Sequence, residues 1–278
     1  MYADDINILV SHPDKDKLND VVNNELQTVC DWFKANRLQM NSSKTKYMIF
    51  QSSKTKSSHT NLPIYADGKA ISRVASINFL GVIIDDRLSW KNHINHIHGK
   101  ISISIGMLYK LRVLLPKKTL FMLYNALVLP YLDYCNVIWS GATEHDINRL
   151  TVLQKKAIRL CTNSPFLAHT PPLFKELGSL TLKDRILYRI GIFMFKYVNS
   201  ILPCIFNDYF MTHCMNHNIN TRYKQNFVLP LCRLKMKQRN SVQYKGTKLW
   251  NSLASSLKCI TSANLFKSKL KLQLLKTY

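Results

Sequence analysis

The stretch INHIHGKISISIGMLYKL, residues 94–111, decides the class of fold. Its apolar residues recur every three or four positions and mark one face of a helix: Ile94, Ile97, Ile101, Ile105, Leu108 and Leu111. The chain keeps this helical character from Ser89 onward, whereas the residues up to about position 86 mix helix and strand patterns. We therefore predict an α+β protein, with short antiparallel strands and one helix in the first part and a mainly α-helical remainder.

Capping residues predict further helices downstream. A threonine followed three residues later by an aspartate is typical of a helix N-terminus. This pattern occurs twice, in Thr143 with Asp146 and in Thr181 with Asp184. Pro116 suits the first turn of an earlier helix. Residues 203–245 are predicted to be loops with short elements, and a basic amphipathic helix is predicted from about Ser262.

The patterns before residue 86 are shorter and alternate in type. Apolar residues from Leu18 to Phe33 mark one face of a helix that opens near Pro13, and the polar run 51–61 is typical of a surface loop. Short apolar runs predict four strands: Ile6–Val10, Tyr47–Phe50, Leu62–Ala66 and Ser76–Ile84. The dipeptide Asp67-Gly68 predicts a hairpin turn between the last two strands.

The charge of the chain favours a polyanionic partner. Its 278 residues include 39 Lys and Arg against 16 Asp and Glu, which gives a formal net charge of +23. Because the positive residues recur along the chain instead of forming one tail, nucleic acid is the preferred interpretation. A basic surface without a dedicated ligand is the alternative.

Cysteine usage and hydrophobic runs bear on the compartment. The 7 cysteines are odd in number and scattered, without a Cys-x-x-Cys pair, which is typical of a reducing compartment. The polar N-terminus indicates no signal peptide, and the apolar runs are too short to span a bilayer. We expect a nuclear or cytoplasmic protein that is not secreted, with no membrane partner; the oligomeric state cannot be predicted.

The tetrapeptide Tyr2-Ala3-Asp4-Asp5 carries the clearest catalytic pattern. Two adjacent carboxylates in a tight turn after a strand supply hard oxygen ligands of the kind that Mg²⁺ prefers. Two such ions can stabilise the attacking and leaving oxygens of a phosphoryl transfer. On its own the pair is a weak signal, and a frayed acidic terminus without function is the preferred interpretation.

The order of motifs along the chain strengthens the interpretation of Asp4 and Asp5 as metal ligands. The chain resembles the second half of the reverse transcriptases of non-LTR (LINE-type), jockey-like retrotransposons. The resemblance rests on Tyr2–Ile6, Leu38–Phe50, Phe79–Asp85, Trp90, His93–Ile94, Lys100–Ile101, Pro130–Tyr134, Trp139, Asn220–Arg222 and Trp250–Asn251. It covers nearly the whole chain, and the order and spacing of several motifs make it more specific than any one of them.

The resemblance implies roles for individual residues. Asp4 and Asp5 would hold two Mg²⁺ ions, and no small-molecule cofactor is implied. Lys44 would be a general acid toward the departing pyrophosphate. Tyr2, Phe79, Leu80 and Gly81 would contact the primer, with an RNA template and a DNA primer as partners. Phe79 and Leu80 suit a buried strand. The alternatives are a solvated lysine at Lys44 and a plain hairpin core at residues 79–81.

Basic residues of the predicted helices could contact phosphates without reading sequence. They cluster near residues 91–118 and recur on a later helix: Lys100, Lys110, Arg112, Lys117 and Lys118, then Arg149, Lys155, Lys156 and Arg159. A solvated helical face is the alternative. Five aromatic residues could stack on bases, although core packing is preferred for them: Trp90, Tyr109, Tyr131, Tyr134 and Trp139.

Two groups of residues are candidate zinc ligands. His93, His96 and His98 lie close in sequence, and His213, Cys214 and His217 could join Cys204 or Cys232. Without a Cys-x-x-Cys pair, neither group is favoured.

The family's fingers and a further palm aspartate would lie upstream of Tyr2. We therefore predict the end of a palm in residues 1–86, a helical thumb in 87–200 and a basic C-terminal region in 201–278. We expect this chain to bind nucleic acid but to be a catalytically incomplete polymerase by itself. The alternatives are an enzyme completed by an upstream fingers-palm fragment, a basic nucleic-acid-binding module without polymerase role, and a chain that does not fold alone.

Overall fold

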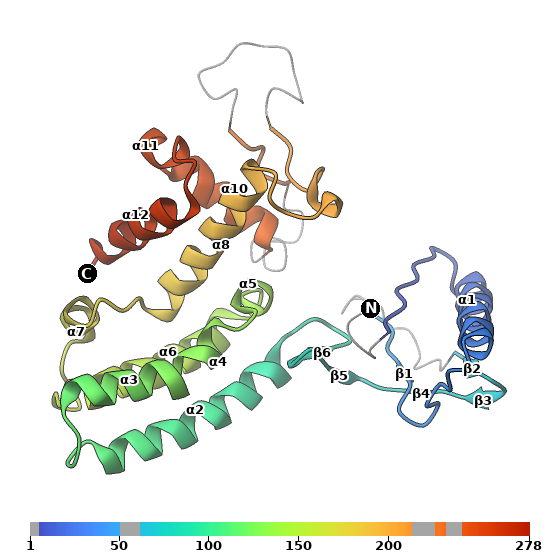
Figure 1. Cartoon of the computed structure of the whole chain (residues 1–278), viewed down its shortest axis with the longest axis horizontal. Coiled ribbons are helices and arrows are strands. Elements are labelled where there is room, and N and C mark those ends of the chain that lie inside the picture. The colour runs from blue at the N-terminus through green and yellow to red at the C-terminus, as the bar shows by residue number, and fades with distance from the viewer. Residues whose placement is uncertain (1–5, 51–61, 213–225, 232–240) are drawn as a thin grey trace. The chain divides into compact units, whose positions relative to one another are not determined.

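The computed structural model describes residues 6–50, 62–212, 226–231 and 241–278. The chain forms two compact units, which we call the α/β unit (Met1–Leu88) and the helical unit (Ser89–Tyr278). Helices dominate and the strands are short (Figure 1), so the predicted α+β class is confirmed with a helical majority.

In the described residues of the α/β unit, we find one helix and three two-stranded ladders. Helix α1 runs over Lys15–Ala35, as predicted. Strand β1 (Lys46–Tyr47) pairs in parallel with β4 (Ser72–Arg73). The antiparallel ladders are β2 (Tyr65–Ala66) with β3 (Lys69–Ala70), and β5 (Ser76–Phe79) with β6 (Val82–Asp85).

A small apolar core joins α1 to the strands. Its buried members are Leu26, Cys30, Leu62, Ile64, Ala66 and Ile71. The Tyr47 hydroxyl donates to the Leu62 carbonyl oxygen at 2.9 Å, which fixes β1 beside the residues that lead into β2. The Lys34–Asp67 ion pair at 2.7 Å is exposed on both sides, so it stabilises this unit little.

Two of the predicted strands are wrong. Residues Ile6–Val10 form no strand, and Ile8 and Leu9 are 44% and 86% exposed. A strand exists only through hydrogen bonds to a neighbour, and among residues 6–50 and 62–88 none pairs with this run. The run Ser76–Ile84 is not one strand either, because it folds back on itself as the β5–β6 hairpin.

Both hairpin turns of the α/β unit use two consecutive left-handed residues. Asp67 and Gly68 have φ of +51° and +74°, and Leu80 and Gly81 have φ of +48° and +79°. Such two-residue turns match the twist of the flanking strands. The predicted turn at Asp67-Gly68 is confirmed, but it joins β2 to β3 instead of reaching Ser76.

The helical unit contains a run of helices, and short loops connect those from α2 to η1. Their bounds are α2 Lys91–Leu111, α3 Lys117–Leu127, α4 Leu129–Asp133, α5 Asn136–Trp139, α6 Glu144–Cys161, α7 Thr170–Glu176, α8 Leu182–Val198, η1 Cys204–Phe206, α10 Val242–Ser252, α11 Ser255–Lys258 and α12 Ala263–Leu275. The predicted caps are confirmed, since Thr143 accepts from the Asp146 N–H and Thr181 from the Asp184 N–H.

Helix α6 lies at the centre of the main core. It packs against α2, α3, α7 and α8. Its buried face includes Leu150, Ala157 and Ile158, each with no exposed surface. The predicted apolar face of α2 meets this core: Ile94, Ile97, Ile101, Ile105 and Leu108 are all buried.

Helix α8 carries the C-terminal helices on its other side. At Gly191 it approaches α12 so closely that a Cβ atom would lie 2.5 Å from Leu270 Cδ2. Phe195 of α8 stacks on Phe266 of α12 with ring centroids 4.6 Å apart. Helix α10 approaches α8 in the same way through Gly246, beside Met194. In the described part of the chain, no helix is long and apolar enough to cross a bilayer.

The central position of α6 predicts the effect of shortening one of its side chains. Leu150→Ala should lower the free energy of unfolding by about 2 to 5 kcal/mol, because it leaves a cavity in a closed core. Urea denaturation would measure the change. The control is Val152→Ala on the same helix, which is 63% exposed and should change stability by less than about 0.5 kcal/mol. Equal losses would contradict the assigned core.

Burial of His93 predicts a pH dependence of stability. The ring is buried on α2 with its centroid 6.1 Å from that of Trp139. Burial, and next the positive charge of His96, lower the pKa of His93 below the ordinary value of 6.5. As the pH drops below about 6.5, the His93 ring therefore becomes protonated in the unfolded chain before it does so in the folded chain. The free energy of unfolding falls accordingly.

His93→Gln should make this loss smaller. Urea midpoints at pH 7.5 and 5.5 would measure the slope, with His145→Gln, an exposed change on α6, as control. An unchanged slope in His93→Gln would refute the assignment, whatever its effect on absolute stability.

Candidate nucleic-acid interface

Several predicted site residues lie outside the residues that the structure describes. These are Tyr2, Asp4 and Asp5 of the acidic turn, and His213, Cys214, His217 and Cys232 of the possible zinc group. Within the described ranges, no three His, Cys, Asp or Glu side chains are grouped so as to hold a metal ion. The metal-ligand assignment of Asp4 and Asp5 thus stays a prediction.

Lys44 stands in a tight turn organised by Asn41. The Asn41 carbonyl oxygen accepts from the backbone N–H groups of Lys44 and Thr45, at 3.1 and 3.0 Å. The Asn41 side-chain oxygen accepts from the Ser43 hydroxyl at 2.6 Å. Asn and Ser favour such local bonds over regular structure. The turn leaves the Lys44 side chain exposed just before β1.

Phe79, Leu80 and Gly81 form the tip of the β5–β6 hairpin. Phe79 is the last residue of β5, and Leu80 and Gly81 are the two turn residues. Leu80 is 38% exposed and lies in the turn, so its predicted place in a buried strand is wrong. Lys44 lies in the turn before β1, which pairs with β4 in a different ladder.

The net charge of the chain lies almost entirely in one unit. The helical unit has 28 Lys and Arg against 6 Asp and Glu, whereas the α/β unit has 11 against 10. No acidic residue occurs between Ser89 and Leu132, a stretch that includes all of α2 and α3. Positive charge on these two helices is therefore not offset by carboxylates of their own.

The predicted contact residues lie along α2 and at its turn to α3. Lys100 and Lys110 are exposed on α2, and Lys117 and Lys118 are exposed in the first turn of α3. Arg112 lies between them, with its guanidinium 4.6 Å from the centroid of the Tyr109 ring. This cation–π contact holds the arginine near the surface of the turn.

Two of the four basic residues predicted on α6 bind other residues of the helical unit. Arg149 donates to the Asn95 side-chain oxygen at 2.8 Å and lies 3.5 Å from Asp146. Arg159 donates to the Ala168 carbonyl oxygen at 2.9 Å. Both arginines join segments of the helical unit, which leaves Lys156 as the exposed cation of this set.

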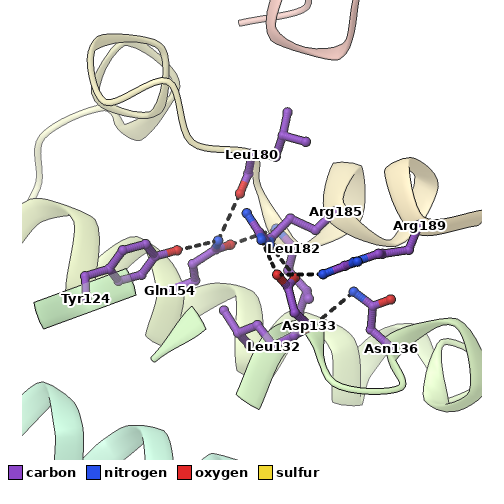
Figure 2. Close-up of polar contacts among 9 residues, drawn as sticks. All are labelled: Tyr124, Leu132, Asp133, Asn136, Gln154, Leu180, Leu182, Arg185 and Arg189. Carbon is purple, nitrogen blue, oxygen red and sulfur yellow. Dashed lines mark hydrogen bonds and ion pairs between the residues drawn. The ribbon is translucent and has the colours of Figure 1, made fainter. Parts of the chain in front are cut away.

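Most carboxylates of the helical unit are already engaged. Figure 2 shows Asp133, at the end of α4, facing Arg185 and Arg189 of α8. Arg185 binds both oxygens of Asp133, and Arg189 reaches one of them at 3.3 Å. This pair is mostly buried, with 15% and 17% of the Arg185 and Asp133 side chains exposed. A paired carboxylate does little to neutralise other cations.

Two further acids of the helical unit are engaged as well. Glu144 pairs with Lys183 at 3.1 Å. Asp184 accepts from the Thr181 hydroxyl and from the Tyr278 hydroxyl at the start of α8. The Tyr278 hydroxyl also accepts from the Thr181 N–H at 2.8 Å. Burial, followed by its bond to Asp184, raises the pKa of Tyr278 to about 12.

A buried glutamine that the sequence interpretation missed connects three segments. Gln154 of α6 has no exposed surface, and its amide group donates to the Tyr124 hydroxyl and the Leu180 carbonyl oxygen, each at 3.0 Å (Figure 2). Its oxygen accepts from the Leu182 N–H at 2.7 Å. The available signal was a polar residue on the apolar face of α6, four positions after Leu150.

The aromatic residues divide between core and surface. Trp90 and Trp139 are buried, as preferred. Tyr109, Tyr131 and Tyr134 are 55%, 37% and 52% exposed, so the preference for core packing is wrong for these three. A tyrosine can lie at the protein surface, because its ring packs against apolar neighbours while its hydroxyl stays in water.

Comparisons with known proteins bear on this surface. The chain is 29% identical over 191 residues to a probable RNA-directed DNA polymerase from transposon BS of Drosophila melanogaster. It is 23% identical over 188 residues to a probable RNA-directed DNA polymerase from transposon X-element of the same fly. It is likewise 23% identical over 188 residues to the RNA-directed DNA polymerase from mobile element jockey of Drosophila funebris.

Each of these matches covers 66% of this chain but only 20% of the relative, so the chain spans about a fifth of the length of the curated relatives it matches. No family model and no solved structure matches. The resemblance predicted from the motifs is confirmed: over about two thirds of its length, the chain is partially homologous to the RNA-directed DNA polymerases of non-LTR retrotransposons.

Proposed function

We propose that the chain binds nucleic acid through the surface of α2 and α3. The observation that carries this proposal is the stretch from Ser89 to Leu132, which has six Lys and Arg residues and no carboxylate. Each lysine on this surface attracts a polyanion, and no carboxylate on these two helices repels it.

The residues of this surface suit phosphates better than base edges. They are mainly lysines with exposed ammonium groups, which act as mobile point charges. Reading of base edges uses side chains fixed in bidentate geometry, such as arginine, asparagine and glutamine. Binding through this surface is therefore expected to be largely independent of sequence and strongly dependent on salt.

The relatives support a proposal about ancestry and chemistry. We assign residues 1–86 to the end of a polymerase palm, residues 87–200 to a helical thumb and residues 201–278 to a basic C-terminal region. RNA-directed DNA synthesis would use Asp4 and Asp5 as Mg²⁺ ligands, Lys44 as general acid and the tip of the β5–β6 hairpin against the primer. An RNA template and a DNA primer would be the partners.

The donor set of the acidic turn fits Mg²⁺ in kind but not in number. Carboxylate oxygens are the ligands that this ion prefers. Two aspartates from one turn offer too few oxygens to fix two octahedral ions without further ligands. We therefore propose that the 278-residue chain by itself binds nucleic acid without extending a primer.

Removing three lysines from the proposed surface should weaken binding. The triple variant Lys110→Ala, Lys117→Ala and Lys118→Ala should lower the salt slope, log K against log salt concentration, by about 2 to 3, since each lost phosphate contact removes about 0.9. Fluorescence anisotropy of a labelled oligonucleotide between 50 and 300 mM salt would measure it.

The matched control removes the same charge elsewhere in the helical unit. Lys175→Ala, Lys196→Ala and Lys248→Ala change exposed lysines of α7, α8 and α10. The control should keep the slope within about 1 of the unsubstituted chain. Equal slopes in the two triple variants would show that binding has no preferred surface.

Primer extension tests the catalytic proposal. With Mg²⁺, an RNA template and a DNA primer, the chain alone should yield no extended product. Extension by the chain alone that Asp4→Asn and Asp5→Asn abolish would overturn the proposal. Extension that appears only after adding a fingers-palm fragment of a related polymerase would show an enzyme assembled from two pieces.

A further inference from the structure

An open groove lies beside the basic surface of α2. It runs between α2 and the junction of α3 with α4, and its volume is about 470 Å³. The lining comes from Lys100, Ile103 and Met107 on one side and from Leu127, Pro130 and Tyr131 on the other. This volume lies within the usual range for small-molecule sites, about 300 to 1,000 Å³.

The walls of the groove are apolar and face solvent. Ile103 is 65% exposed, Met107 is 41% exposed and Tyr131 is 37% exposed. The Ser104 hydroxyl in the lining is already engaged. It lies within hydrogen-bond distance of the Lys100 and Leu127 carbonyl oxygens, at 3.2 and 3.1 Å. The groove thus offers flat apolar contact and few groups that could read the edge of a ligand.

Cations flank this apolar surface. Residues 100, 103, 107 and 110 are spaced by three and four positions, so Lys100 and Lys110 lie on the same face of α2 as Ile103 and Met107. The two lysines are about 15 Å apart along the helix. On α3, Lys118 lies two turns from Ala126 on one face, and Ala126 lines the groove.

We propose that this groove takes an unpaired nucleobase of a single-stranded nucleic acid, with the flanking phosphates on Lys100 and Lys110. The proposal rests on the proposed function and adds that the surface prefers single strands to duplexes. Charge complementarity selects the occupant, because α2 and α3 contain no carboxylate and Asp133, at the end of α4, is paired with Arg185. An apolar peptide helix would use the walls but would leave the lysines without counterions.

An unpaired base is required because only its faces are free. In a duplex both faces of each base are covered by neighbouring bases, whereas a single strand can turn one base outward. Stacking on an aromatic ring such as Tyr131 adds about 1 to 3 kcal/mol per base, and every base has a π-face. The preference is therefore for unpaired strands of any sequence.

The test compares a single strand with a duplex of the same length. A labelled 12-nucleotide oligonucleotide and its blunt duplex would be titrated with the full chain at 150 mM salt. The unsubstituted chain should bind the single strand about tenfold more tightly, which corresponds to one stacked base. The double variant Ile103→Gln and Met107→Gln should lose this preference while keeping its affinity for the duplex and its salt slope.

Both changes are at exposed helical positions and alter no charge, and equal thermal midpoints by circular dichroism would verify the fold. The control Met122→Gln and Val152→Gln changes two exposed apolar residues outside the groove lining and should keep the preference. Equal affinity of the unsubstituted chain for both oligonucleotides would overturn the proposal, as would an undiminished preference in the groove variant. Absence of salt-dependent binding to either oligonucleotide would instead refute the proposed function.

Discussion

Mutual repulsion of cations is the constraint under which the helical unit folds. A surplus of 22 positive charges in residues 89–278 favours expansion of the chain. The unit counters it with an apolar core around α6 and with carboxylates placed between helices, above all Asp133 against Arg185. At the centre, where an ion would be costly, α6 uses the neutral amide of Gln154, with partners for both ends. The lysines are thereby left at the surface.

Features of the fold that are encoded locally could be predicted from the sequence. The helices that begin at Thr143 and Thr181 were found because a cap and an apolar period need only nearby residues. Strand pairing depends on a distant partner, which is why Ile6–Val10 and Ser76–Ile84 were misassigned. The turn at Leu80-Gly81 escaped notice because leucine seldom adopts the left-handed conformation that it has there.

The candidate site was predictable to a smaller extent. Lys100, Lys110, Lys117 and Lys118 could be selected by charge and do lie at the surface. The sequence could not show that Arg149 and Arg159 connect segments of the unit, because their partners are set by tertiary packing. It also could not show the groove, since Ile103 and Tyr131 come from helices whose distance depends on the whole core. Helical periodicity assigns a residue to a face but does not say what that face meets.

The uneven division of charge between the two units has a kinetic consequence. A polyanion in solution exerts a long-range pull on the helical unit and almost none on the α/β unit, whose charges nearly cancel. Encounters therefore begin at the helical unit, at rates that added salt would slow. Under the proposed function, a strand held by the helical unit has a raised local concentration around the covalently linked α/β unit. The contacts proposed for the Lys44 turn and the β5–β6 hairpin would therefore not need to be strong enough to capture a strand from dilute solution.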